Sequence, residues 1–156
     1  MTNNLSLMVY NEIGILSRIT NLLVSKNFPI LNLSLNSTEL SNISKIFLEL
    51  SGSKEEIDQI IKQLTKLIQV IEVKKINFDN TIERQLMLVK VICSPAKRTA
   101  LLEIANIFKA NIIHISDSFF IFEIFGSSEK VLNFQKIVKI YGNINVVKTG
   151  KIFIEK

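Results

Sequence analysis

One succession of strand-like and helix-like segments occurs twice along this chain, and this repeat limits the possible folds more than any other feature. The first half begins with an apolar strand over residues 5–10 and a stretch of helical periodicity over 15–23. Two β-rich runs follow at 30–35 and 43–50, and then come a second helical stretch and a strand over 70–76. The order β-α-β-β-α-β is typical of a ferredoxin-like domain.

Individual residues mark where these segments begin and which side they bury. Ser53 and Glu56 have the S-x-x-E spacing of a capping box, so the second helix is expected to begin just after Gly52. Apolar and polar residues alternate from Ile30 onward, which predicts a strand with Ile30 and Asn32 on the same face.

The second half repeats the order with a shorter hairpin. Its predicted segments are a strand over 86–92, a helix capped by Ser94, strands over 112–116 and 119–125, a helix after Gly126 and Ser127, and a strand over 144–147. Asp117 and Ser118 are left as a tight turn between the two middle strands. We therefore predict an α+β protein of two tandem ferredoxin-like βαββαβ domains, residues 1–77 and 82–156, joined by a short polar hinge.

The composition supports a folded core and excludes several classes of protein. Hydrophobic residues make up 47% of the 156 residues, with only 5 glycines and 2 prolines, which excludes disordered and collagen-like chains. One cysteine and one histidine exclude an intramolecular disulfide framework and leave too few ligands for a zinc site. The stretch 110–122 is too short and too polar to span a membrane, and no signal or transit peptide is visible. We therefore expect no membrane association.

Few residues of this chain are suited to chemistry. Cys93 precedes a predicted helix, but the only histidine, His114, lies in an apolar strand, so no nucleophile is paired with a base. No two carboxylates have a spacing that nominates an acid-base pair, and no phosphate-binding glycine loop is present. We expect no catalytic residue, no metal ligand and no cofactor of the chain's own.

The turn from Asn11 to Gly14 is the one segment with a functional interpretation. A strand ends and a helix begins there, so free backbone N–H groups and the positive end of the helix dipole point to one place. Gly14 lets a ligand approach the backbone, and Asn11 is a candidate helix cap or acceptor for an ammonium group. A small zwitterion such as an amino acid fits these groups. An ordinary N-capped turn is the alternative interpretation.

Five short motifs, in order along the chain, resemble one known family. The stretch N-E-I-G-I-L-S-R-I at 11–19 resembles the N-E-x-G-x-L-S-R-(V/I) signature of the small, regulatory subunits of acetolactate synthase. Phe28 and Ile30 occupy the slot of the family's G-Y/F-N-I-E-S-L. The other three are K-Q-L-x-K-L-I-x-V-I-x-V at 62–73, E-R-x-L-M-L-V-K at 83–90 and V-x-x-x-G-K-I at 146–152.

The resemblance implies an N-terminal ACT domain followed by a second ferredoxin-like domain. It implies a non-catalytic protein of branched-chain amino acid biosynthesis that binds and activates the large catalytic subunit and confers feedback inhibition, usually by valine. Thiamine diphosphate, Mg²⁺ and FAD would belong to that large subunit. The resemblance also implies a homodimer through the ACT domains.

In this family the effector lies between the two ACT domains of such a dimer. The residues that match the site by position are Asn11, Gly14, Ile15 and Leu16 on the loop side and Ile30 on the facing side. Three neighbouring positions depart from the family: Pro29 stands where an asparagine is usual, and Asn27 and Asn32 replace the usual glycine and serine.

Two other functions remain open. A free-standing double-ACT regulator that senses an amino acid would share the fold and the Gly14 turn. A basic RNA-binding protein would account for the net charge of +5 and for the four phenylalanines of 119–125, although that run lacks the consensus of RNA-recognition domains. The lysines are scattered, and we interpret their abundance as the mark of an AT-rich genome, so we expect no nucleic-acid partner. The expected location is the plastid stroma for a plastid-encoded chain and the bacterial cytoplasm otherwise.

Overall fold

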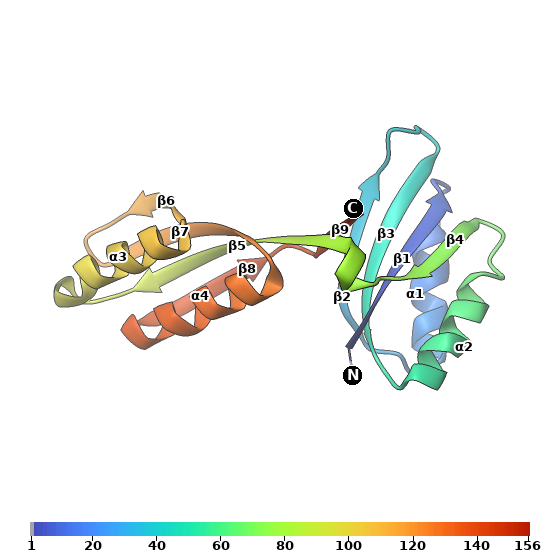
Figure 1. Ribbon diagram of the computed structural model, residues 1–156, viewed down its shortest axis with the longest axis horizontal. Helices are drawn as coiled ribbons and strands as arrows, with labels where there is room; N and C mark the ends of the chain where they lie inside the picture. Colours follow the sequence, from blue (N-terminus) through green and yellow to red (C-terminus); the bar gives the residue numbers. More distant parts are fainter. Residues whose placement is uncertain (1) are drawn as a thin grey trace. The chain divides into compact units, whose positions relative to one another are not determined.

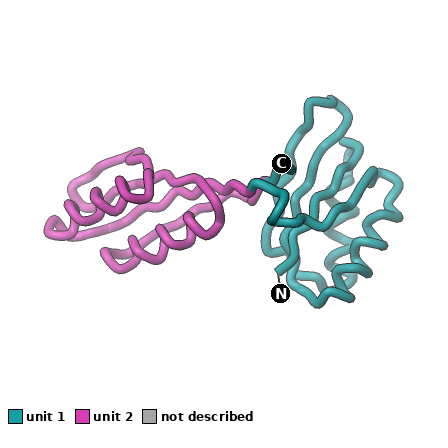
Figure 2. Tube along the Cα trace, viewed as in Figure 1, with its two compact units in different colours: residues 1–82, 153–156 teal, residues 83–152 magenta. Residues whose placement is uncertain are grey.

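The computed structural model describes residues 2–156, which form two compact units (Figure 2). The first unit runs to Ile82 and includes Phe153–Lys156, and the second unit is Glu83–Ile152. The polar segment 77–81 therefore lies within the first unit, at its boundary with the second. Phe153–Lys156 also belong to the first unit, whereas the division made from the sequence placed them in the second domain.

The first unit has the expected order of strands and helices (Figure 1). Its elements are β1 (Thr2–Tyr10), α1 (Ile15–Ser25), β2 (Ile30–Ser37), β3 (Ile43–Ser51), α2 (Lys54–Leu64) and β4 (Val70–Lys75). The strands form one antiparallel sheet in the order β2-β3-β1-β4, with β2 and β4 at the edges. The ferredoxin-like prediction is confirmed for this half.

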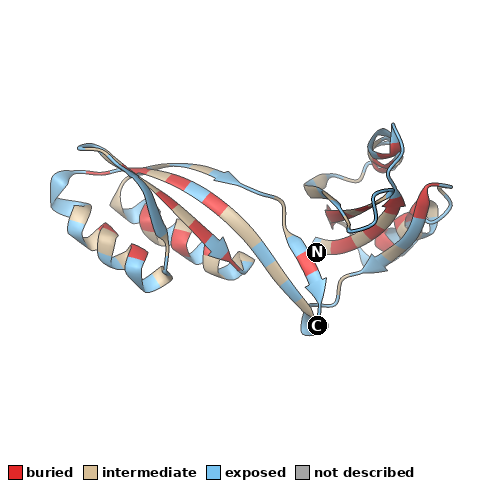
Figure 3. Cartoon of the chain, turned by 90° about the horizontal axis from the view of Figure 1, so that it is seen from above, coloured by how far each residue is buried: buried red, intermediate tan, exposed pale blue. Residues whose placement is uncertain are grey.

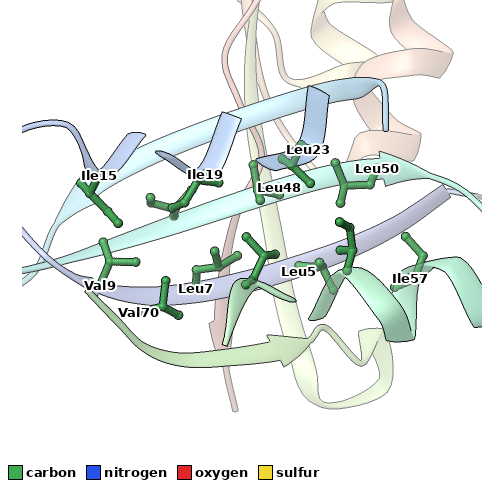
Figure 4. Packing of buried hydrophobic residues seen from close by; sticks show 13 residues of the cluster. Leu5, Leu7, Val9, Ile15, Ile19, Leu23, Leu48, Leu50, Ile57 and Val70 are labelled. Carbon is green, nitrogen blue, oxygen red and sulfur yellow. The ribbon is translucent and has the colours of Figure 1, made fainter. Parts of the chain in front are cut away.

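Both helices of the first unit cover the same face of the sheet, and the core lies between the two layers (Figure 4). The buried side chains include Ile15, Ile19 and Leu23 of α1, Ile57, Ile60 and Leu64 of α2, and Leu5, Leu7 and Val9 of β1. The predicted capping box starts α2: the Ser53 N–H donates to Glu56 Oε2 at 2.7 Å, and the Glu56 N–H donates to Ser53 Oγ at 3.3 Å.

Strand β2 departs from simple alternation near its start. Ile30 pairs with Leu50 but Asn32 pairs with Glu49, so a β-bulge shifts the register between them. Ile30 and Leu33 both pack against the buried cluster, and Asn32 lies on the opposite face. The expectation that Ile30 and Asn32 share a face is wrong, because alternation with period two holds only while the ladder is regular.

The second unit repeats the architecture. Its elements are β5 (Thr81–Ile92), which begins in the first unit, α3 (Arg98–Phe108), β6 (Asn111–Ile115), β7 (Phe119–Gly126), α4 (Ser128–Tyr141) and β8 (Asn143–Lys148). The sheet order is β6-β7-β5-β8, and buried residues alternate with exposed or half-buried ones along β5 (Figure 3). Phe120 and Phe122 of β7 pack against Phe134 of α4 in the core of this unit.

The sequence predicted three junctions of the second unit, two helix caps and one turn, and the structure confirms two of them. The Ser127 side chain caps α4 by accepting a hydrogen bond from the Lys130 N–H at 3.3 Å. The predicted turn between β6 and β7 is closed by the Ser116 N–H, which donates to the Phe119 carbonyl at 2.9 Å. Ser94 makes no side-chain cap, because a short 3₁₀ helix, η2 (Pro95–Lys97), intervenes and α3 begins only at Arg98.

Gly142, between α4 and β8, lies very close to the backbone of β5. Gly142 joins these elements, and a Cβ built on it would lie 1.9 Å from the Ile92 carbonyl oxygen and 2.9 Å from the Ile92 carbonyl carbon. Real Cβ atoms do not come so near to backbone atoms. Any side chain at this position would clash with the Ile92 carbonyl, so glycine is required here.

A ninth strand, β9 (Ile152–Glu155), which the sequence did not predict, pairs with β5. Its Phe153 is buried against the first unit, with its ring centroid 5.4 Å from that of Phe47 and 6.2 Å from that of Phe78. Phe47 lies on the side of β3 that faces away from the helices, and Phe78 lies in the 3₁₀ helix η1 (Phe78–Asn80). The strand thus covers part of the sheet face that α1 and α2 leave open.

The helices of both units are short. α1, α2 and α3 have 11 residues each and α4 has 14. An α-helix needs about 20 residues to cross a bilayer. Within residues 2–156 no helix is long and apolar enough to do so.

Candidate functional site

The turn from Asn11 to Gly14 lies between two other loops at one end of the first sheet. The Tyr10 N–H donates to the Gln69 carbonyl at 2.9 Å, and the Asn11 N–H donates to the Asn42 carbonyl at 2.8 Å. Gln69 belongs to the loop before β4, and Asn42 to the loop between β2 and β3. These hydrogen bonds fix where the chain enters α1.

Gly14 has a backbone conformation that side-chain-bearing residues rarely adopt. Its φ is 87° and its ψ is 0°, in the left-handed region, and it is the N-cap residue of α1. No atom lies within 4 Å of a Cβ built on it. The requirement for glycine is therefore conformational, and the space beside its backbone is open.

The N-terminus of α1 keeps unsatisfied hydrogen-bond donors. No side chain caps it, and its first turn has no acidic residue. In the described part of the chain, the N–H groups of Leu16 and Ser17 have no backbone acceptor. These two donors and the positive end of the helix dipole form a place suited to a carboxylate. Asn11 does not cap α1, so one of the two roles considered for its side chain is excluded.

Ile15 and Leu16, the two apolar residues assigned to the loop side of the site, differ in which way they face. Ile15 is only 5% exposed and packs into the core under α1, so its side chain supports the turn from below. Leu16 is 36% exposed and stands at the surface beside Gly14. An apolar ligand side chain at the helix N-terminus would therefore meet Leu16 and only the backbone of Ile15.

Within one chain Ile30 is far from this turn. Ile30 pairs with Leu50, and Leu50 pairs with Asn3 near the start of β1. The turn follows Tyr10 at the other end of β1, which is roughly 20 Å away at the rise of a β-strand. A single chain brings Asn11, Gly14 and Leu16 together, but it does not bring Ile30 to them.

Comparison with protein families divides the chain at nearly the same place as the structure. Residues 5–72 match the family described as the AHAS small subunit-like ACT domain, and residues 84–156 match the small subunit of acetolactate synthase. A protein of Archaeoglobus fulgidus named "Probable acetolactate synthase small subunit" is 34% identical over 152 residues, which are 97% of this chain and 95% of that protein. The chain belongs to the acetolactate synthase small-subunit family.

Other members of the family have the same two domains. The crystal structure of the acetolactate synthase small subunit from Thermotoga maritima has a TM-score of 0.87 and 26% identity, covering 100% of this chain and 98% of that one. "Acetolactate synthase small subunit 2, chloroplastic" of Arabidopsis thaliana is 33% identical over 97% of this chain and 32% of that longer protein. The resemblance seen in the sequence is thus confirmed, and the first unit is an ACT domain. This small subunit is therefore a regulatory subunit, and its partner is the large catalytic subunit.

Three exposed apolar side chains near the turn were missed from the sequence. They are Ile13 at the tip of the turn, 105% exposed, Ile68 before β4, 90% exposed, and Leu40 before β3, 55% exposed. Each lies in a loop, outside the periodic pattern of any helix or strand. An apolar residue in such a position has no core to face, and this could have indicated its exposure from the sequence. Each of the three loops that meet at this end of the first sheet therefore exposes an apolar side chain.

The residues considered for chemistry do not meet in the small subunit. Cys93 is buried in the core of the second unit, and His114 stacks on Phe119, with ring centroids 5.5 Å apart, on the other face of the sheet. The thiol and the imidazole therefore face opposite sides. From residue 2 to the end of the chain, no three His, Cys, Asp or Glu side chains are grouped closely enough to hold a metal ion.

Two cavities of the ACT domain lie away from the turn. One, of about 620 Å³, is bounded by α2 and by Lys26 and Phe28. The other, of about 450 Å³, lies on the face opposite the helices, and its lining includes Lys45, Lys74, Lys75 and Lys156. Lys74 pairs with Glu72 at 3.1 Å, and this hydrogen bond and the charge of the carboxylate raise the pKa of Lys74. Part of the positive charge of that cavity is thus already neutralised.

Proposed function

We propose that this small subunit activates the large catalytic subunit of acetolactate synthase and has no catalytic residue of its own. The observation that carries the proposal is the match to small subunits along both domains, with 97% of this chain aligned. A free-standing double-ACT regulator would share the fold, but it would have no reason to match the acetolactate synthase small subunit over residues 84–156. Thiamine diphosphate, Mg²⁺ and FAD are expected on the catalytic subunit, and the complex is expected in the bacterial cytoplasm or the plastid stroma.

Reconstitution tests this proposal. The purified chain alone should not consume pyruvate, and adding it to the cognate catalytic subunit should raise the rate of acetolactate formation. A heat-denatured sample of the same chain is the control for effects of added protein. An unchanged rate at saturating small subunit would refute the assignment.

We further propose that valine binds at the N-terminus of α1 and inhibits the complex. Its carboxylate would accept hydrogen bonds from the N–H groups of Leu16 and Ser17, which have no other acceptor in the described structure. Its side chain would contact Leu16, and Asn11 is available to accept a hydrogen bond from the ammonium group.

A dimer through β2 would complete this site with Ile30 of a second copy. β2 is an edge strand, so one side of its backbone is free to pair with another strand. If two copies pair β2 with β2 antiparallel, the start of one strand lies beside the end of the other. The turn from Asn11 to Gly14 lies at the end of the sheet where β2 finishes, because Asn11 bonds to the loop between β2 and β3. Ile30 of the second copy would therefore lie near the 11–14 turn of the first copy, although the two are far apart within one chain.

A further inference from the structure

Three turns lie side by side at one end of the sheet of the ACT domain (Figure 1). They connect β1 to α1, β2 to β3, and α2 to β4. Tyr10 at the end of β1 pairs with Ile43 at the start of β3, and its neighbour Val9 pairs with Val70 at the start of β4. Neighbouring strands are about 4.8 Å apart, so the strand ends that carry the three turns lie within about 10 Å of one another.

Hydrogen bonds fix the backbone of each turn and join the turns to one another. Each turn is closed by a backbone N–H that donates to a carbonyl three residues earlier: Ile15 to Glu12 at 3.3 Å, Ile43 to Leu40 at 3.0 Å, and Val70 to Leu67 at 2.9 Å. The hydrogen bonds of the Tyr10 and Asn11 N–H groups connect the first turn to the other two loops. The three turns therefore form one unit whose backbone is ordered before any partner binds.

Each turn exposes one large aliphatic side chain. Ile13 and Ile68 are the second residues of their turns, and Leu40 is the first residue of its turn. Such positions usually hold Pro, Gly, Asn, Asp or Ser, which suit both the turn and contact with water. Ile13 and Ile68 are nevertheless almost fully exposed, and Leu40 is more than half exposed. We call these three side chains the three-turn surface.

The three-turn surface has the size and surroundings of the centre of a protein interface. Its side chains expose roughly 450 Å² in all, about half of what one partner contributes to a standard interface. The exposed residues Glu12, Glu39 and Lys66 lie within two positions of its members in the sequence and supply a polar rim. Because the backbone beneath is already ordered, binding a partner here costs little conformational entropy.

We propose that the three-turn surface binds the large catalytic subunit. This inference rests on the proposed activation of that subunit, because activation requires contact between the two proteins. An apolar centre with charges of both signs around it fits a folded protein. A nucleic acid would require an excess of cations to neutralise its phosphates.

A second copy of this chain, paired through β2, would not cover this surface. β2 and β4 are opposite edges of the sheet. Ile68 lies two residues before β4, and three strand spacings, or about 14 Å, separate β4 from β2. A dimer formed at the β2 edge therefore leaves Ile68 free to contact the catalytic subunit.

The turn that carries Ile13 also carries Gly14 of the proposed effector site. The effector would meet the backbone at Gly14 and the N–H groups that follow it, whereas the side chain of Ile13 is exposed at the next position. An effector inhibits only if it binds the active and the inhibited arrangement with different affinity. Contact of Ile13 with the catalytic subunit would give this difference directly, because ligand and partner would bind the same turn.

Titration of the catalytic subunit with full-length variants tests the proposal. Ile13→Ser and Ile68→Ser each remove an exposed apolar side chain and leave a residue that is common in turns, so the fold should persist. Each variant should raise the concentration of small subunit that gives half-maximal activation at least about tenfold, as loss of a central interface residue does. Ile107→Ser, at an exposed isoleucine of α3, is the control and should match the wild type. Circular dichroism checks that all three variants are folded.

A footprint locates the contact without using activity. Ile68→Cys supplies an exposed thiol, whereas Cys93 is buried. The rate at which a maleimide labels the small subunit is followed by mass spectrometry. An excess of catalytic subunit should slow the labelling of Ile68→Cys and leave that of Ile107→Cys unchanged. Without the catalytic subunit, the labelling rate of Ile68→Cys should not depend on the concentration of the small subunit.

Three results would overturn the proposal. The first is activation by the wild type with the same half-maximal concentration for both turn variants. The second is labelling of Ile68→Cys at its full rate in a complex that sedimentation shows to have formed. The third is protection of Ile68→Cys by a higher concentration of small subunit alone, which would assign the surface to a second copy.

Failure of the proposed activation would be recognised separately. In that case the wild-type chain leaves the rate of the catalytic subunit unchanged, while the footprint still shows whether the three-turn surface is covered.

Discussion

Gly14 is the residue at which the proposed effector site is most open to a simple test. Gly14→Asp places a carboxylate beside the free N–H groups of α1, where it would occupy and repel the position proposed for the carboxylate of valine. Aspartate tolerates the left-handed conformation better than most residues, so the cost to folding should be about 1 kcal/mol. We expect the reconstituted complex to keep its activity and lose its inhibition by valine.

Asn21→Asp is the matched control, because it adds the same charge on the exposed side of α1, away from the turn. Its inhibition curve should match that of the wild type. If Gly14→Asp also gives the wild-type curve, Gly14 is not part of the effector site.

Pro29 leads to a second expectation at the same scale. Proline has no N–H and no polar side-chain atom, so a ligand beside the start of β2 loses the hydrogen bonds that an asparagine would offer. Each such bond to a charged group contributes roughly 1.5 to 3 kcal/mol, or about ten- to a hundredfold in affinity. We expect weak valine binding by the wild type and a gain of that size in Pro29→Asn, measured by isothermal titration calorimetry.

The bulge in β2 removes the nearest substitute for that asparagine. Asn32 lies on the face opposite Ile30, so it cannot take over the lost hydrogen bonds on the side of Ile30. Tight binding by the wild type, with no gain in the variant, would contradict this expectation and would show that the site does not use this position.

At the scale of elements, the junction of α4 and β8 should be intolerant of any side chain. Gly142→Ala forces a methyl group toward the Ile92 carbonyl, and overpacking of this kind typically costs about 1 to 3 kcal/mol. Urea denaturation followed by circular dichroism should show a lower free energy of unfolding. Asn133→Ala on the exposed side of α4 should change it by no more than about 0.5 kcal/mol. Equal stabilities of the two variants would show that the backbones can separate without cost.

The sequence predicted those helix ends that depend on contacts between residues close together in the chain. Ser53 and Glu56 lie three residues apart and close the capping box by hydrogen bonds to each other, so their spacing was enough to predict where α2 begins. Periodicity likewise predicted both sheets and all four helices. It failed at the β2 bulge, because a register shift is decided by pairing with β3, which lies far along the chain.

The candidate site was predictable only in part for the same reason. The turn at 11–14 was found from the sequence, but the candidate cap was Asn11, whereas Gly14 holds the N-cap position without a side chain. That Ile15 faces the core and Leu16 faces outward depends on how α1 lies on the sheet. The four residues of β9 were too few to give a periodic signal.

At the scale of the whole molecule, we expect self-association through the edge strand β2. Light scattering at micromolar concentration should give a mass no smaller than twice 17.7 kDa. Leu35→Lys puts a charge on this edge and should reduce the mass, because charged residues on edge strands oppose pairing. Leu132→Lys, at a leucine of similar exposure on α4, is the control. A wild-type mass of one chain would contradict the proposed site, which needs Ile30 from a second copy.

The burial of Phe153 against Phe47 and Phe78 has a consequence for the order of events during synthesis. Phe153 leaves the ribosome after the whole of the second unit, yet it belongs to the first. The helix-covered core of the ACT domain is complete once β4 has emerged, so it can fold early. Phe47 on the other face stays without its contact to Phe153 until the end of the chain has been made. The second unit is therefore an insertion tied to the first at both ends, and a nascent chain stopped anywhere before Phe153 presents an ACT sheet with an uncovered aromatic patch to the chaperones that meet it.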